Sequence, residues 1–258
     1  MAAEAVPTRL TGKIAIVTGA GQGIGRASAQ RLAAEGATVV VVDANSAGTE
    51  ETVKLIGEAG GTAKAATVDV TSADQLERLV AETVEEFGRL DIAHNNAGVD
   101  IGRHPTLVDT TEDEWDRIMS VNLKGIWLSM RAEIPAMTQA GGGSIINTAS
   151  AGAFKAGPGF SAYATTKAGV VMLTRAAALE NSAANIRVNA IAPGMVRTPM
   201  LESAFSDSPQ LEQMLVQMTP MGRISDASEM ASIIAFLASD DASFVTGATI
   251  VADGGSLA

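Results

Sequence analysis

The residues best suited to chemistry are a tyrosine and a lysine four positions apart, with a serine upstream of them. On a helix, Tyr163 and Lys167 would share one face, so that the lysine ammonium could sit near the phenol. A solvated helical pair is the alternative. Ser150 lies thirteen residues before Tyr163, at the expected carboxyl end of a strand, where parallel sheets bind ligands. Together the three residues indicate a site rather than a chance pair.

A second chemical feature is a run of four glycines at alternate positions in the segment 18–25. The run does not fit the G-x-G-x-x-G pattern in any register, but it falls at an expected strand-to-helix turn. Glycine lets the backbone approach a phosphate group, and the following helix would offer free N–H groups and its positive dipole end. The turn therefore predicts pyrophosphate binding, with a merely tight turn as the alternative.

An acidic residue at the end of the second expected strand bears on the choice of cofactor. Asp43 lies eighteen residues beyond Gly25, close to the spacing at which an acid accepts hydrogen bonds from an adenosine ribose. Its charge would repel a 2′-phosphate, and the neighbours Ala44 and Asn45 supply no arginine. We therefore expect NAD rather than NADP, unless Asp43 is only a solvated strand-end residue.

Strand and helix patterns alternate along the whole chain. Strands are expected over 13–18, 37–43, 62–70, 90–95, 144–149, 187–192 and 248–252. Helices are expected over 26–35, 46–58, 72–87, about 111–138, about 161–181 and about 227–238. The alternation predicts an α/β fold, a single-domain doubly wound Rossmann-type seven-stranded parallel sheet with helices on both faces. This domain would span 1–258, with 1–9 as a flexible tail.

Composition limits the classes of function. The chain has 258 residues, of which 47% are hydrophobic and 18% charged, enough for a large core. A net charge of -11 disfavours nucleic acids and anionic lipid surfaces as partners. With no cysteine and two isolated histidines, neither a disulfide nor a metal site is expected, and redox chemistry would need a borrowed cofactor. The start lacks a secretory pattern and no apolar run would span a membrane, so we expect a cytoplasmic protein.

One segment, 193–222, breaks the alternation of strands and helices. It is irregular or helical and holds five of the eleven methionines. Methionine is adaptable, so a cluster of this kind can cover a ligand, although ordinary helix packing explains it equally well. We interpret 193–222 as a substrate-covering segment.

Over essentially its whole length the chain resembles the short-chain dehydrogenase/reductase family. The motifs that carry the resemblance are Thr18-Gly-x-x-x-Gly23-x-Gly25, Asp69-Val70, Asn95-Asn96-Ala97-Gly98, Asn122, Ser150, Tyr163-x-x-x-Lys167, and Pro193-Gly194 followed by Thr198. They occur in the order that the family shows. The resemblance implies an oxidoreductase that moves a hydride between NAD(H) and a secondary alcohol or its ketone.

The resemblance also implies catalytic roles. Tyr163 would be the general acid/base, because a proton must be handled as charge develops on the carbinol oxygen. Lys167 and the oxidised nicotinamide would favour the phenolate, and Ser150 would hydrogen-bond the reacting oxygen. Lys167 would also hold the nicotinamide ribose. Asn122 would carry a proton-relay water, with a purely structural helix kink as the alternative.

The same resemblance implies a cofactor site. Asp69 and the Val70 backbone would border the adenine, Thr198 the nicotinamide carboxamide, and Asn96 to Gly98 the adenosine side. Asn96 could instead be mainly a buried polar residue of the turn. The cofactor-binding residues expected are Gly19, Gln22, Gly23, Ile24, Gly25, Asp43, Asp69, Val70, Asn96, Ala97, Gly98, Tyr163, Lys167, Pro193, Gly194, Val196 and Thr198.

Substrate, assembly and rival functions are less constrained. The segments 99–104, 151–160 and 195–221 should line the substrate and offer no obvious charge anchor, which favours a neutral alcohol or ketone. The resemblance implies a homotetramer. An NADPH-dependent 3-oxoacyl-type ketoreductase is the main rival, which Asp43 disfavours, and a non-catalytic NAD-binding scaffold would have lost part of the catalytic set. His94, where the family has an apolar residue, is expected to be a hydrogen-bonded core histidine.

Overall fold

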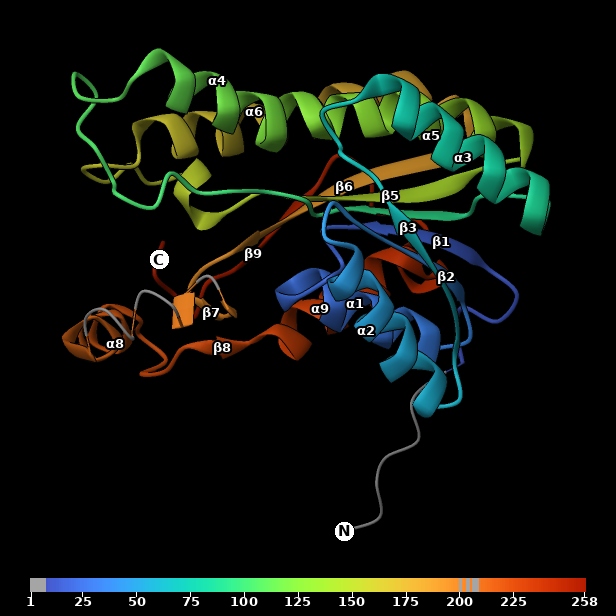
Figure 1. Cartoon of the computed structure of the whole chain (residues 1–258), viewed down its shortest axis with the longest axis horizontal. Coiled ribbons are helices and arrows are strands. Elements are labelled where there is room, and N and C mark those ends of the chain that lie inside the picture. The colour runs from blue at the N-terminus through green and yellow to red at the C-terminus, as the bar shows by residue number, and fades with distance from the viewer. Residues whose placement is uncertain (1–7, 200, 203–204, 206–208) are drawn as a thin grey trace, which may run out of the picture.

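A seven-stranded parallel sheet forms the centre of the protein in the computed structural model, which describes residues 8–199, 201–202, 205 and 209–258 (Figure 1). The strands are β1 (Ile14–Thr18), β2 (Thr38–Asp43), β3 (Thr62–Thr67), β4 (Ile92–Asn95), β5 (Gly143–Thr148), β6 (Ile186–Pro193) and β9 (Thr249–Ala252). Their order is β3-β2-β1-β4-β5-β6-β9 and every pairing is parallel. This confirms the predicted fold class.

Helices cover both faces of the sheet. Figure 1 shows α1 (Gly23–Ala34), α2 (Ser46–Glu58) and α9 (Ala227–Ala238) below it, with α3 (Ala73–Phe87), α4 (Glu112–Met119), α5 (Gly125–Gln139) and α6 (Ser161–Asn181) above. Two hydrophobic cores result. One joins strand residues such as Val40 to α3, α5 and α6, and the other joins Val39 and its neighbours to α1 and α9. Alternate residues of one strand thus serve opposite cores.

The strand order places a crevice at the carboxyl ends of the central strands. β1 pairs with β2 on one side and β4 on the other, so the chain winds outward in opposite directions from this point. In doubly wound sheets, ligands bind where the order reverses. Thr18, Asn95 and Thr148, which end β1, β4 and β5, therefore lie at the edge where the sequence motifs cluster.

The expected helix 111–138 is interrupted by a wider turn. The chain forms α4, then a π-helical turn over Ser120–Lys124, then α5. The amide of Gly125 donates to the carbonyl of Ser120, five residues back. Such turns occur often at functional sites because they redirect side chains within a continuous helix. Asn122 lies at the centre of this one, a detail that hydrophobic periodicity cannot predict.

Other boundaries differ from the expectations by a few residues. α1 begins at Gly23 rather than 26, because the Arg26 amide already donates to the Gln22 carbonyl, four residues back. β3 ends at Thr67 rather than 70, because the Asp69 side chain accepts from the Thr71 amide and turns the chain. Of the expected tail 1–9, residues 1–7 lie outside the described residues, while Arg9 forms ion pairs with Glu35 and Asp241.

The described residues between β6 and α9 form a small substructure of their own at the end of the sheet. β7 (Val196–Arg197) pairs in parallel with β8 (Ser225–Asp226), and α8 (Pro209–Met218) lies between them in sequence and apart from the helices covering the sheet (Figure 1). Met200 lies outside the described residues. The other four methionines are each at least 43% exposed: Met195, Met214, Met218 and Met221. They do not contribute to a helix-packing core.

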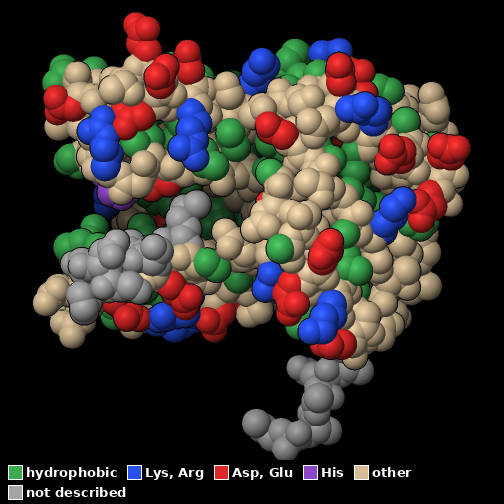
Figure 2. Space-filling model, viewed as in Figure 1, with side chains coloured by type: hydrophobic (Ala, Val, Ile, Leu, Met, Phe, Trp, Pro, Cys, Tyr) green, Lys and Arg blue, Asp and Glu red, His purple; other side chains and the backbone are tan. Residues whose placement is uncertain are grey.

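Figure 2 shows that this face of the molecule is hollowed between the part that carries α4 and the part that carries α8, with hydrophobic side chains inside the hollow. Within the described part of the chain, no helix combines the length and the apolar character needed to cross a membrane.

A buried carboxyl group lies between the sheet and α5. Glu133 is 2% exposed and accepts a hydrogen bond from Asn95 Nδ2 at 3.0 Å. The same amide nitrogen donates to Asn147 Oδ1 at 3.2 Å. Burial raises the pKa of Glu133 to about 7, and the Asn95 hydrogen bond opposes this only in part. The native protein therefore holds a largely uncharged Glu133 below neutral pH.

We expect Glu133→Gln to remove a pH-dependent loss of stability. Unfolded chains release this proton near pH 4.5, whereas the native protein keeps it until about pH 7. Stability therefore falls as pH rises through that window, by about 3 kcal/mol in total at 1.36 kcal/mol per pKa unit. In thermal unfolding, the Tm of Glu133→Gln relative to that of the wild type should increase from pH 5 to pH 8. The exposed control Glu50→Gln should not show this, and parallel curves for Glu133→Gln would contradict the interpretation.

Candidate active site

Ser150, Tyr163 and Lys167 come together at the carboxyl end of β5. Tyr163 and Lys167 are one turn apart on α6, and Lys167 Nζ lies 5.6 Å from the centre of the Tyr163 ring. Ser150 follows β5 and hydrogen-bonds the Tyr163 side chain. The Gly152 amide donates to Ser150 Oγ at 3.1 Å and so orients the hydroxyl. The fold thus brings together the three residues that the sequence singled out.

The electrostatics of this set are dominated by desolvation. Burial raises the pKa of Tyr163, the hydrogen bond with Ser150 lowers it, and the negative charge of Asp100 raises it. Burial lowers the pKa of Lys167 to about 8. Lys167 is only 3% exposed and donates to the Thr148 carbonyl at 2.8 Å. The Lys167 ammonium therefore titrates close to physiological pH, and its position is fixed. The phenol of Tyr163 by itself stays protonated at neutral pH.

Asn122 holds the loop after β4 against this group. Its Oδ1 accepts from the Val99 amide at 2.8 Å, and its Nδ2 donates to the Val99 carbonyl at 2.9 Å. A Cβ on Gly98 would lie 3.4 Å from Asn122 Oδ1 and 3.7 Å from Lys167 Nζ, so the three residues are neighbours. The side-chain amide of Asn122 thus positions the loop after β4. The π-helical turn agrees with the alternative of a structural helix kink.

The glycine turn forms a close-packed cradle ahead of α1. A Cβ on Gly25 would lie 2.1 Å from the Gly19 carbonyl oxygen, and one on Gly19 would lie 2.8 Å from Ala97 Cα. Gln22 caps α1 without a side-chain hydrogen bond, and the first turn, which includes Gly23 and Ile24, carries no acid. Its N–H groups and positive dipole end remain open to an anion. These features fit the pyrophosphate of a dinucleotide.

Asp43 lies directly beside this cradle. Its Oδ2 accepts from the Gly21 amide at 2.9 Å, and its Oδ1 accepts from the Asn45 amide at 3.0 Å. The sequence interpretation missed an arginine here. Arg26 donates to the Gly21 carbonyl and, at 3.0 Å, to Thr52 Oγ1. The position of Arg26, one turn into α1 on the side of α2, could have identified it from the sequence. Its side chain brings a positive charge near the expected ribose position.

Asn96 ties three strand ends together. Its Nδ2 donates to the carbonyls of Thr18 and Gly19, both at 3.2 Å, and its Oδ1 accepts from Thr148 Oγ1 at 3.3 Å. The amides of Asn96 and Ala97 both donate to Thr18 Oγ1. All of these Asn96 side-chain hydrogen bonds are made within the protein, which agrees with the alternative of a buried polar residue in the turn.

The remaining expected cofactor residues lie along the same edge of the sheet. Asp69 is exposed at the start of α3, and Val70 is buried against Gly125. Pro193 ends β6, and a Cβ on Gly194 would lie 2.7 Å from Asp253 Cα. Val196 is buried in β7, and Thr198 lies over the glycine turn, because a Cβ on Gly23 would lie 3.3 Å from its Cγ2.

His94 is a core histidine, as expected. It is fully buried, with Nδ1 2.8 Å from Ser28 Oγ and Nε2 2.9 Å from Thr148 Oγ1. Burial lowers its pKa to about 3, so the ring is neutral at physiological pH. It joins α1 to the end of β5 by hydrogen bonds on both ring nitrogens.

The expected substrate-lining loop 99–104 does contain a charged group that acts on the site. The negative charge of Asp100 raises the pKa of Tyr163, whereas Arg103 in the same loop pairs with Glu114. The sequence interpretation saw no charge anchor in this loop. The position of Asp100, two residues beyond Gly98, was the signal that could have identified it.

Comparison with known proteins agrees with this geometry. A family model described as enoyl-(acyl carrier protein) reductase matches residues 19–256. Levodione reductase of Leifsonia aquatica is 40% identical, with 100% of this chain and 99% of that protein covered. Cyclohexanol dehydrogenase of an Acinetobacter species is 39% identical, with 95% of each covered. The structure of 7α-hydroxysteroid dehydrogenase with NADH and 7-oxo glycochenodeoxycholic acid superposes with a TM-score of 0.91, at 35% identity, over 98% of this chain and 97% of that one.

The chain belongs to the short-chain dehydrogenase/reductase family. It is an oxidoreductase that acts on alcohol or ketone substrates, and a nicotinamide cofactor is typical of its family.

Proposed function

We propose that this enzyme transfers a hydride between NAD(H) and a neutral secondary alcohol or its ketone. The observation that carries the proposal is the convergence of Ser150, Tyr163 and Lys167 beside a glycine cradle that fits a pyrophosphate. The names of the relatives, which include a cyclohexanol dehydrogenase and a hydroxysteroid dehydrogenase, support cyclic alcohols as the substrate class.

In this proposal, Tyr163 exchanges the proton of the reacting oxygen. Ser150 hydrogen-bonds that oxygen and also lowers the pKa of the phenol, which opposes the effect of burial. Lys167, held by the Thr148 carbonyl, lies 5.6 Å from the centre of the phenol ring and would hold the nicotinamide ribose. Asn122 fixes the loop beside both groups and is the residue proposed to carry the relay water. When bound, the nicotinamide supplies the hydride acceptor or donor and, when oxidised, a positive charge.

The cofactor-binding roles follow the same edge. The pyrophosphate would lie on the glycine cradle and the open N-terminus of α1, the adenosine between Asp43 and the Asp69-Val70 turn, and the nicotinamide near Thr198 and Pro193. One domain spans the chain in this proposal, and the segment 193–222 covers the substrate. Its exposed methionines support an adaptable cover. The cytoplasmic location stays a prediction.

We expect Tyr163→Phe to abolish turnover while leaving NADH affinity within about twofold. The variant keeps the ring and loses only the proton donor, and a general acid/base contributes at least about a hundredfold. Steady-state rates with cyclohexanol and cyclohexanone, read from NADH absorbance, test the first statement. Quenching of protein fluorescence by NADH tests the second. Turnover within tenfold of the wild type would contradict the role of Tyr163.

Asp43 supports NAD over NADP, whereas Arg26 could favour NADP. We expect wild-type kcat/KM to be higher with NAD, because the carboxylate repels a 2′-phosphate. Asp43→Asn should lower the NAD value by about tenfold, which corresponds to one charged hydrogen bond, and should raise the NADP value. Arg26→Met should change the ratio little. A wild-type preference for NADP, lost in Arg26→Met, would instead support the NADPH-dependent 3-oxoacyl-type ketoreductase.

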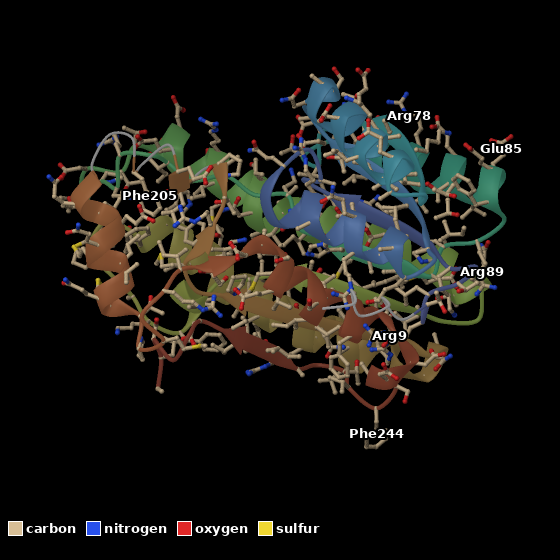
Figure 3. The ribbon with its side chains drawn as sticks, turned by 90° about the horizontal axis from the view of Figure 1, so that it is seen from below. Arg9, Arg78, Glu85, Arg89, Phe205 and Phe244 are labelled. Atoms are coloured by element: carbon tan, nitrogen blue, oxygen red, sulfur yellow. The ribbon has the colours of Figure 1, made fainter. Side chains whose placement is uncertain are left out.

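Two exposed apolar surfaces support a homotetramer. The first is a groove between α5 and α6, lined among others by Leu123, Trp127 and Met172, of which Trp127 is 44% and Met172 60% exposed. The second lies at the β9 edge of the sheet, where Phe244 is fully exposed and points away from the body (Figure 3). A closed tetramer with twofold symmetry needs two such self-complementary surfaces.

Light scattering should therefore give the mass of four chains. Met172→Glu places a charge in the first surface and should reduce the mass to two chains, because the second surface is intact. A wild-type mass of one chain would contradict the proposal.

A further inference from the structure

The loop that carries Asp100 is held rigidly beside the catalytic group. Val99 is bound through both its amide and its carbonyl to Asn122, and Gly98 is a neighbour of Asn122 and Lys167. Asp100 follows directly. The main chain at Asp100 is therefore placed by the same contacts that position the residues proposed to react.

The same loop packs on the residues that lead into α6. The His104 and Phe160 rings stack with their centres 4.4 Å apart. A Cβ on Gly159 would lie 2.5 Å from the His104 carbonyl oxygen, so the two segments are in direct backbone contact. Phe160 is the N-cap of α6, three residues before Tyr163. The loop 98–104 thus packs against Asn122 and Lys167 at one end and against the start of α6 at the other.

One oxygen of this carboxylate has no hydrogen-bond donor among the described residues. Asp100 Oδ1 accepts from the Ile101 amide at 2.8 Å. Oδ2 faces only His104 Nδ1, at 3.9 Å, which is beyond hydrogen-bond distance. The Asp100 side chain is 23% exposed, so water reaches it only in part. Oδ2 is thus accessible, and a ligand that donated a hydrogen bond to this charged oxygen would bind favourably.

The charge of Asp100 does not assist proton transfer. It raises the pKa of Tyr163, which disfavours the phenolate needed to take a proton from an alcohol. A carboxylate that works against the general base is better explained by recognition of the substrate than by the chemical step.

We propose that Asp100 is a specificity-determining residue whose free Oδ2 accepts a hydrogen bond from a second hydroxyl group of the substrate. The proposal rests on the proposed function and names its substrate class as diols and hydroxyketones. A neutral hydroxyl satisfies Asp100 without adding a second cation near Lys167, which an ammonium group would do. The same carboxylate repels carboxylate and phosphate groups, which agrees with a neutral substrate.

The test compares cyclohexanol with 1,2-, 1,3- and 1,4-cyclohexanediol as substrates in the presence of NAD. For the wild type, kcat/KM should be about tenfold higher for at least one diol than for cyclohexanol, as expected for one hydrogen bond to a charged acceptor. Asp100→Ala should abolish this preference. Because Asp100 also raises the pKa of Tyr163, the measure in each variant is the ratio of the diol value to the cyclohexanol value. Asp100→Asn, which keeps a neutral acceptor, should retain part of the preference. The exposed control Asp113→Asn should match the wild type.

NADH binding to each variant, measured by fluorescence quenching, should be unchanged and shows that the variants are folded. If the wild type prefers a diol and Asp100→Ala keeps that preference, or if the wild type has no preference, the inference on Asp100 is overturned while the proposed function stands. Preference for 2-aminocyclohexanol over every diol, lost in Asp100→Ala, would overturn the choice of a hydroxyl. Absence of turnover of all alcohols and ketones would contradict the proposed function and this inference with it.

Discussion

The amide of Asn96 is the contact on which the site geometry depends. It binds the carbonyls of Thr18 and Gly19 at the end of β1 and accepts from Thr148 at the end of β5. The Thr148 carbonyl in turn holds Lys167. One side chain therefore sets the separation between the glycine cradle and the Tyr163–Lys167 pair. Any ligand that touches both must match a distance that is fixed by hydrogen bonds within the protein.

Burial, more than pairing of charges, controls the titratable groups around this contact. His94 is neutral, Lys167 titrates near 8 and Glu133 near 7, in each case because desolvation disfavours the charged form. Only Lys167 lies at the reacting group. The other two are hydrogen-bonded core residues, which shows that a shifted pKa identifies a site only when geometry agrees with it.

Two carboxylates mark the two ends of the ligand crevice. Asp43 lies beside the glycine cradle, where both its oxygens accept backbone amides. Asp100 follows the loop held by Asn122, and its negative charge raises the pKa of Tyr163. In our proposals each carboxylate selects a hydroxyl group and repels an anion, Asp43 on the ribose and Asp100 on the substrate. Two of the 29 acidic residues of the chain would thus discriminate between ligands by their local charge.

The sequence by itself determined the fold class, the number of strands in the main sheet and the residues of the Ser150, Tyr163 and Lys167 set. These follow from periodicity and from spacings of a few residues, which local backbone geometry converts directly into shared faces and strand ends. It could not determine that Asn122 lies in a π-helical turn, that Arg26 reaches Gly21, or that Asp100 has an unpaired oxygen beside Tyr163. The surroundings of these residues come from segments far apart in the chain, such as Val99 for Asn122 and Thr52 for Arg26, because burial and hydrogen-bond partners exist only once the strands and helices have packed.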